Sequence, residues 1–209
     1  MALSSKALQQ KRAKKAAKRK DTRKQGSTAP KGLAVEWLAA ARAPVADVYT
    51  PESLFETGMG SVWFSRTLED GRYALGVFLV DTFCLGVKNA MYTILEPEQY
   101  HVQMENFLHL SGEAFIPQEP AYARKLVESA IAYARELGLS PHADYKIAKE
   151  IFGGVDASDS DAVFAFGRDG NPVYMPGPDD SPTEQRRVIK QLERLRQDPY
   201  ALLARGFND

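Results

Sequence analysis

The stretch VDTFCLGVK, residues 80–88, brings a carboxylate, a thiol and an amine close together along the chain. Asp81 ends an apolar run, and the end of a central strand is a common place for a metal-binding or catalytic carboxylate. Cys84 would be a nucleophile if a base such as His142 lay within hydrogen-bond distance. In the simpler interpretation Cys84 is a small buried residue, and Asp81 caps a turn or pairs with Lys88 or an arginine.

The stretch SPHADY, residues 140–145, predicts His142 and Asp144 in the first turn of a helix. Free backbone N–H groups there attract anions, so a phosphate site is one interpretation. The other is that Asp144 complements the helix dipole and that His142 makes a loop contact. His101 and His109 have no third ligand for a zinc site nearby, so we expect surface histidines, no metal site and no cofactor. The catalytic candidates are therefore Asp81, Cys84, His142 and Asp144.

A different chemistry is offered by KRAKKAAKRKDTRK, residues 11–24. Closely spaced mobile cations attract a phosphate backbone, and each neutralised phosphate releases counterions, which makes such binding strongly salt-dependent. Lysine lacks the planar fork of arginine, and the stretch has no aromatic side chain to stack on a base, so it would read charge rather than sequence. The expected nucleic-acid-binding residues are Lys11, Arg12, Lys14, Lys15, Lys18, Arg19, Lys20, Arg23 and Lys24.

The formal net charge of zero conceals a separation of charge along the chain. Residues 1–31 hold eleven Lys and Arg and a single acid, Asp21, whereas residues 32–209 hold sixteen Lys and Arg and twenty-six acids. A segment of net charge +10 thus precedes one of −10, and such asymmetry points to a polyanionic partner. The competing roles for this segment are a membrane tether, a nuclear localisation signal and a solubilising tail. A membrane tether would need a hydrophobic face or a lipid site, and the segment shows neither.

Composition limits the class of protein. No apolar run approaches the ~20 residues that a membrane-spanning helix needs, and the N-terminus lacks an apolar signal core. The single cysteine excludes an intramolecular disulfide and every multi-cysteine zinc site. We therefore expect a cytoplasmic protein without membrane contact.

Strand signals come first along the chain. Residues 61–68 and 72–81 flank the turn Glu69-Asp70-Gly71, which predicts a hairpin. The second of these runs is apolar on both faces and predicts a covered, central strand. A third strand is expected at 84–95, with Gly86 as a possible bulge.

A second hairpin is expected from residues 163–166 and 173–175 around the turn 168–171, with Pro172 placing the return strand at an edge. Its aromatic residues, Phe164 and Phe166, are more typical of core than of base stacking. The helices are predicted from their apolar periodicity, with Pro120 and Gly138 at the ends of one helix and the capping box Ser181-Pro182-Thr183-Glu184 at the start of another. These are residues 33–42, 98–110, 120–137, 140–152 and 181–196.

Together these elements predict an α+β fold, in which a mainly antiparallel sheet of two hairpins is covered by several helices. A disordered basic arm and linker, residues 1–31, would precede a single domain, residues 32–209.

Three stretches together, FLVDTFCLGVKNA, ESAIAYARELGLSPHADY and FAFGRDGNPVYMPGPDDS, resemble an uncharacterised family of bacterial cytosolic proteins of similar length. The resemblance covers roughly residues 50–190 and leaves the arm outside. It implies one bacterial cytosolic domain and supplies no activity, ligand or site residue.

The functional expectation is a non-enzymatic protein associated with RNA, the ribosome or DNA, which holds the phosphate backbone through its arm. One alternative is a small metal-dependent hydrolase or nuclease that uses Asp81 with His142 or Asp144. A further alternative is a protein-interaction module, in which the anionic domain or the C-terminal helix, with Val188, Leu192 and Leu195, docks a protein partner.

Overall fold

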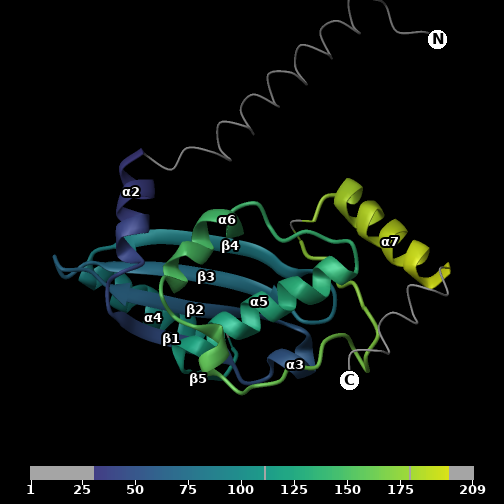
Figure 1. Cartoon of the computed structure of the whole chain (residues 1–209), viewed down its shortest axis with the longest axis horizontal. Coiled ribbons are helices and arrows are strands. Elements are labelled where there is room, and N and C mark those ends of the chain that lie inside the picture. The colour runs from purple at the N-terminus through teal and green to yellow at the C-terminus, as the bar shows by residue number, and fades with distance from the viewer. Residues whose placement is uncertain (1–30, 111, 179, 198–209) are drawn as a thin grey trace, which may run out of the picture. The chain divides into compact units, whose positions relative to one another are not determined.

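The computed structural model describes residues 31–110, 112–178 and 180–197, so the nine predicted nucleic-acid-binding residues lie outside the described residues. Trp37 and the described residues after it form one compact unit. This unit has the predicted α+β fold, in which an antiparallel sheet carries helices on both faces (Figure 1). None of the described helices is both long and apolar enough to cross a membrane.

The sheet has five strands in the order β4-β3-β2-β1-β5, and every neighbouring pair is antiparallel. The predicted first hairpin is confirmed, because β2 pairs with β3 around a turn at residues 68–72. The predicted third strand follows as β4. The strands are β1 (Val45–Pro51), β2 (Met59–Thr67), β3 (Tyr73–Asp81), β4 (Gly86–Leu95) and β5 (Phe115–Pro117).

Six helices and two short 3₁₀ turns of the described residues connect or cover these strands. Those predicted at 98–110, 120–137 and 181–196 are confirmed within a residue or two. The described elements are α2 (Lys31–Ala40), α3 (Leu54–Thr57), α4 (Pro97–Leu110), α5 (Pro120–Glu136), α6 (Tyr145–Ala148) and α7 (Pro182–Gln197), with 3₁₀ turns η1 (Lys149–Phe152) and η2 (Ala157–Asp159).

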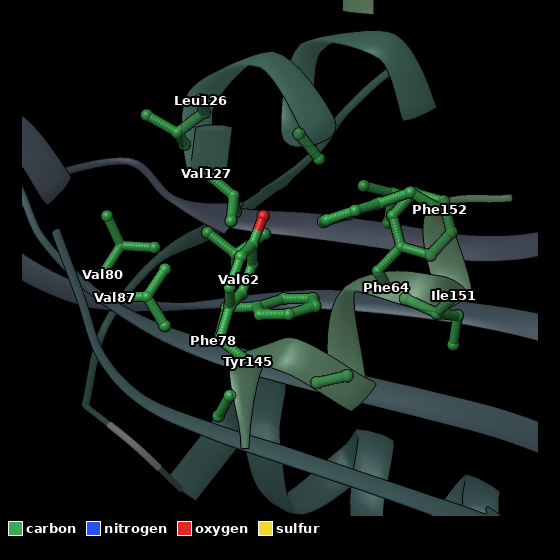
Figure 2. Packing of buried hydrophobic residues seen from close by; sticks show 14 of the residues in the cluster. Val62, Phe64, Phe78, Val80, Val87, Leu126, Val127, Tyr145, Ile151 and Phe152 are labelled. Atoms are coloured by element: carbon green, nitrogen blue, oxygen red, sulfur yellow. The ribbon is translucent and has the colours of Figure 1, made fainter. Parts of the chain in front are cut away.

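Residues of β2 alternate between two cores, because successive side chains of a strand point to opposite faces of the sheet. Val62 and Phe64 belong to the cluster that packs beneath α5, α6 and η1, where Figure 2 shows Val127 and Phe152 lying against the sheet. Trp63, between them, lies in a separate cluster on the α4 face. Coverage of both faces explains why β3 is apolar throughout, as predicted for a central strand.

Beneath α4 a small polar network is fully hydrogen-bonded. The Tyr100 hydroxyl donates to Asp47 Oδ2 at 2.6 Å and lies 2.7 Å from Ser65 Oγ. Trp63 Nε1 donates to the same hydroxyl at 3.4 Å. Burial, together with the bond to Asp47, raises the pKa of Tyr100, so the phenol stays protonated and can keep donating.

On the α5 face a buried arginine ties three segments together. Arg66 of β2 is 5% exposed, and its guanidinium donates to the carbonyl oxygens of Ala43, Ile151 and Phe152. The last two carbonyls belong to η1, so the arginine supplies donors that the end of this short helix lacks. Burial lowers the pKa of Arg66, because the low-polarity surroundings disfavour the charge.

The second predicted hairpin is wrong. Residues 163–166 and 173–175 form no strands, and one isolated bridge joins Arg168 to Asn171 around a tight turn. Two hydrogen bonds to the β3–β4 turn explain the difference: Gly167 N donates to Thr82 O at 2.9 Å, and Val173 N donates to Phe83 O at 3.1 Å. On either side of this turn, the backbone of the segment, residues 163–175, is therefore bonded to another loop.

The helix predicted at residues 140–152 begins later and breaks. His142 N donates to Val87 O on β4 at 2.9 Å, which holds residues 140–144 outside the helix. Regular α-helix covers only α6, and the chain then tightens into η1. The predicted burial of Tyr145, Ala148 and Ile151 is confirmed. Two short strands, β1 and β5, were not predicted.

Candidate functional site

Asp81, at the end of β3, organises the turn that leads into β4. Its Oδ1 accepts from Phe83 N and Cys84 N, each at 2.9 Å, which is the turn-capping role that the simpler interpretation gives it. The side chain is fully buried, and Oδ2 has no hydrogen-bond partner among the described residues. Burial raises the pKa of Asp81 to about 6, because the charged form is poorly solvated there.

Cys84 is buried in an apolar cluster with Ala134, Leu137, Val188 and Leu192. Burial, assisted by the nearby Asp81, raises the pKa of its thiol to about 12. A nucleophilic cysteine needs a lowered pKa and an accessible sulfur. The surroundings of Cys84 supply neither, and they match those of a small packed core residue.

Lys88 lies at an irregularity in β4. Leu79 of β3 pairs with Asn89, and Val80 pairs with Val87, so Lys88 is the extra residue of a β-bulge. The predicted bulge at Gly86 is displaced by two residues, because Gly86 pairs regularly with Asp81. A bulge turns a side chain away from the regular pleat, and here it accompanies a lysine that meets the loop 174–180.

The partner of Lys88 is Asp180, which precedes α7. Lys88 Nζ lies 2.9 Å from Asp180 Oδ2 and donates to Met175 O at 3.0 Å. The same Asp180 oxygen accepts from Tyr174 Oη at 2.7 Å and Gly177 N at 2.8 Å. Burial alone would raise the pKa of Asp180, but these hydrogen bonds and the lysine charge hold it below its ordinary value.

A cavity of about 310 Å³ opens beside this ion pair. Its walls come from β4, from the loop after α5 and from the start of α7. His142 therefore lies at the same cavity as the Lys88–Asp180 pair, whereas the sequence suggests it as a base for Cys84 or a partner of Asp81. The polar side chains that line the cavity are Lys88, His142, Tyr174, Asp180, Glu184 and Arg187.

The four catalytic candidates do not form a common catalytic group. Asp144 Oδ2 lies 3.8 Å from His142 Nδ1, on the exposed side of the loop. Asp81 and Cys84 are buried under the turn and do not line the cavity. Across the described residues, no group of three or more His, Cys, Asp or Glu side chains is arranged to hold a metal ion. His101 and His109 are exposed, as predicted.

No protein-family model, curated protein or solved structure matches the chain. The resemblance to a bacterial family therefore stays a prediction. Function has to be inferred from the residues of this chain alone.

The outer face of α7 is a second candidate site, and it is cationic. The helix is anchored by a capping box, in which Ser181 N donates to Glu184 Oε2 at 3.0 Å and Glu184 N donates to Ser181 Oγ at 3.3 Å. Three of its apolar residues point into the protein, where Val188 and Leu192 are buried and Leu195 packs beside them, whereas Ile189 is exposed. Five exposed cations remain on the helix: Arg186, Arg187, Lys190, Arg194 and Arg196.

Sequence reasoning missed both of these groupings. It treated Lys88 only as a partner for Asp81 and considered α7 only for its apolar residues. The sequence held no signal for the ion pair; in the structure, a Cβ at Gly177 would lie 2.9 Å from Lys88 Nζ. The signal for the cationic face was the spacing of arginines and lysine on the side of α7 opposite Val188 and Leu192.

Proposed function

We propose that the protein is a nucleic-acid-binding protein, with RNA as the principal partner, and that its Lys/Arg-rich N-terminal segment holds the phosphate backbone. The observation that carries this proposal is the separation of charge, +10 in residues 1–31 against −10 in the remainder. A strongly anionic body would be repelled by a polyanion. The cationic segment must therefore supply the attraction, and it brings nine cations into fourteen residues.

The two alternatives have less support. A metal-dependent hydrolase centred on Asp81 needs an accessible carboxylate with further ligands, whereas Asp81 is buried and hydrogen-bonded to its own turn. A protein-docking helix needs a free apolar stripe, whereas Val188 and Leu192 are buried in the body. The anionic surface stays available to a protein partner, and RNA binding by the N-terminal segment is compatible with it.

The test is a salt series with a fluorescent RNA and a DNA of matching sequence. The full-length chain is compared with a variant in which the nine cations of residues 11–24 are replaced by glutamine. A protein that makes six to ten phosphate contacts loses about 10³–10⁵ in affinity between about 50 and 200 mM salt. We expect this steep dependence for the natural chain and its loss in the variant. Equal, salt-insensitive affinity of the two proteins would contradict the proposal.

A further inference from the structure

The outer face of α7 carries more positive charge than the helix needs for its own stability. On a helical projection at about 100° per residue, Arg186, Lys190, Arg194 and Arg187 fall within an arc of about 100° that holds no acid. Neighbouring like charges three and four residues apart destabilise a helix. Of the four, only Arg194 lies in the last turn, where the helix dipole favours cations. Helix stability therefore does not explain the whole cluster.

Arg186, Lys190 and Arg194 are free to meet a ligand, and Arg187, beside them, also lines the cavity near Glu184. Arg187, Lys190 and Arg194 make no ion pair or side-chain hydrogen bond within the described part of the chain, and Arg186 donates only to Pro182 O of its own helix, at 3.2 Å. The surroundings make the charge distinctive. Residues 37–181 hold ten Lys and Arg against twenty-one acids, whereas α7 holds five cations against two acids.

Two of the three glutamines of α7 are engaged within the protein. Gln185 Nε2 donates to Asp180 O at 3.0 Å, and Gln191 Nε2 donates to Leu137 O at 3.0 Å. No aromatic residue lies on the helix. Guanidinium groups bind phosphates well, and a surface without a stacking platform does not favour unpaired bases, so this surface suits a phosphate backbone.

We propose that Arg186, Arg187, Lys190 and Arg194 form a second contact surface of the protein, which binds the phosphate backbone of double-helical RNA. This inference rests on the proposed function, because it deepens the same activity. Val188 and Leu192 bury one side of the helix against the body, so α7 presents its cations at the surface and is not a free helix that could be inserted into a groove about 8.5 Å deep, such as the major groove of DNA. The wide and shallow minor groove of A-form RNA presents its phosphates without such insertion.

The surface also complements the N-terminal segment. A Lys-rich segment supplies long-range attraction, whereas a helix holds its cations at fixed spacing. Arg186, Lys190 and Arg194 succeed one another every four residues, about 6 Å apart along the axis and about 12 Å from first to last. Such spacing allows several phosphates to be bound together without ordering the chain first.

The test uses the full chain carrying Arg186→Gln, Lys190→Gln and Arg194→Gln, because glutamine is a good helix former and removes only charge. The matched control carries Arg135→Gln, Lys146→Gln and Lys149→Gln, three exposed cations outside α7. Each lost phosphate contact should lower the salt slope by about one, so we expect the α7 variant to lose about three units of slope and at least about tenfold in affinity for an RNA duplex. The control should stay within about threefold.

Each other result has a definite meaning. If the N-terminal variant loses RNA binding while the α7 variant does not, the proposed function stands and the α7 surface is wrong. Equal losses of RNA affinity in the α7 variant and in the control would show that only the net charge matters, which would contradict the proposed α7 surface. A natural chain that binds no RNA would overturn both proposals.

Two further experiments decide the partner, and a third covers the case in which the triple variant does not fold. A DNA duplex that is bound with the same dependence on α7 would overturn the assignment to RNA, and so would preferential binding to vesicles rich in anionic lipid. If the triple variant fails to show the native circular dichroism spectrum, single substitutions take its place, at Arg186, Lys190 or Arg194. Each single substitution is expected to lower the salt slope by about one.

Discussion

Arg66 and Asp81 are two buried charges that lie near opposite ends of the β2–β3 hairpin. Arg66 gives its donors to three backbone carbonyls, from Ala43, Ile151 and Phe152. Asp81 has two backbone donors on one oxygen and none on the other within the described residues. The comparison teaches that burial alone does not define the role of a charge. The satisfied guanidinium ties segments together, whereas the half-satisfied carboxylate makes the fold sensitive to pH.

The largest effect is expected from Arg66→Met. Methionine retains most of the apolar stem but leaves three carbonyls without donors, each at a cost of about 1–3 kcal/mol, so the free energy of unfolding should fall by at least about 3 kcal/mol. Urea unfolding at neutral pH, followed by circular dichroism, measures this loss. Arg135→Met, at an exposed position, should change stability by no more than about 0.5 kcal/mol. A loss below about 1 kcal/mol at Arg66 would show that water replaces the guanidinium.

The next effect concerns Asp81 and pH. Folding raises the pKa of this carboxyl from 3.8 to about 6, so between those values the native state binds more protons than the unfolded chain. Its contribution to stability is complete below pH 3.8 and is lost as the pH rises through about 6. Asp81→Asn removes the titration, and relative to the natural chain it should gain about 3 kcal/mol between about pH 4 and 7.5.

The measurement is the difference in free energy of unfolding between the two proteins across this pH range. Asp81→Ala serves as the control for the turn, because it removes the charge and also the acceptor for Phe83 N and Cys84 N. It should be less stable than Asp81→Asn by about 1–3 kcal/mol at every pH. A difference between the natural chain and Asp81→Asn that does not change with pH would show that Asp81 titrates normally.

A smaller effect is expected from Lys88→Met. Asp180 keeps its bonds from Tyr174 and Gly177, so we expect a loss of only about 1 kcal/mol. The charge of Lys88 also lowers the pKa of Asp81, and its removal should move the pH dependence of stability to higher pH. Repeating the substitution in the Asp81→Asn background should abolish that shift. Persistence of the shift there would assign it to a group other than Asp81.

Much of the fold could be predicted, because local signals agree with the final structure where elements pair with their neighbours in sequence. The β2–β3 hairpin, α5 and the capping box of α7 are examples, each marked by turn or cap residues. The second hairpin failed because the backbone of residues 167 and 173 bonds to Thr82 and Phe83, about ninety residues earlier in the chain. Strands β1 and β5 were not predicted for a similar reason, since β5 is defined only by its pairing with β1.

The candidate site was predicted only in part. The sequence identified Asp81 and His142 as candidates. It also predicted the turn-capping role of Asp81, which the geometry matches. It did not link Lys88 with Asp180, because an ion pair across ninety-two positions leaves no periodic pattern. Nor did it show that the apolar stripe of α7 is buried, which is what leaves the arginines facing outward. Tertiary contacts between distant segments decide both features.

The hydrogen bonds of Gly167 to Thr82 and of Val173 to Phe83 have a consequence for the order of folding. Strands β2, β3 and β4 succeed one another along the chain and can pair before residues 163–175 close over their turn. We expect water to reach the carboxylate of Asp81 until then. Closure and the docking of α7 over Cys84 should bury the carboxylate, and between about pH 4 and 6 this final step should take up a proton. Acid should therefore favour completion of the fold rather than formation of the sheet.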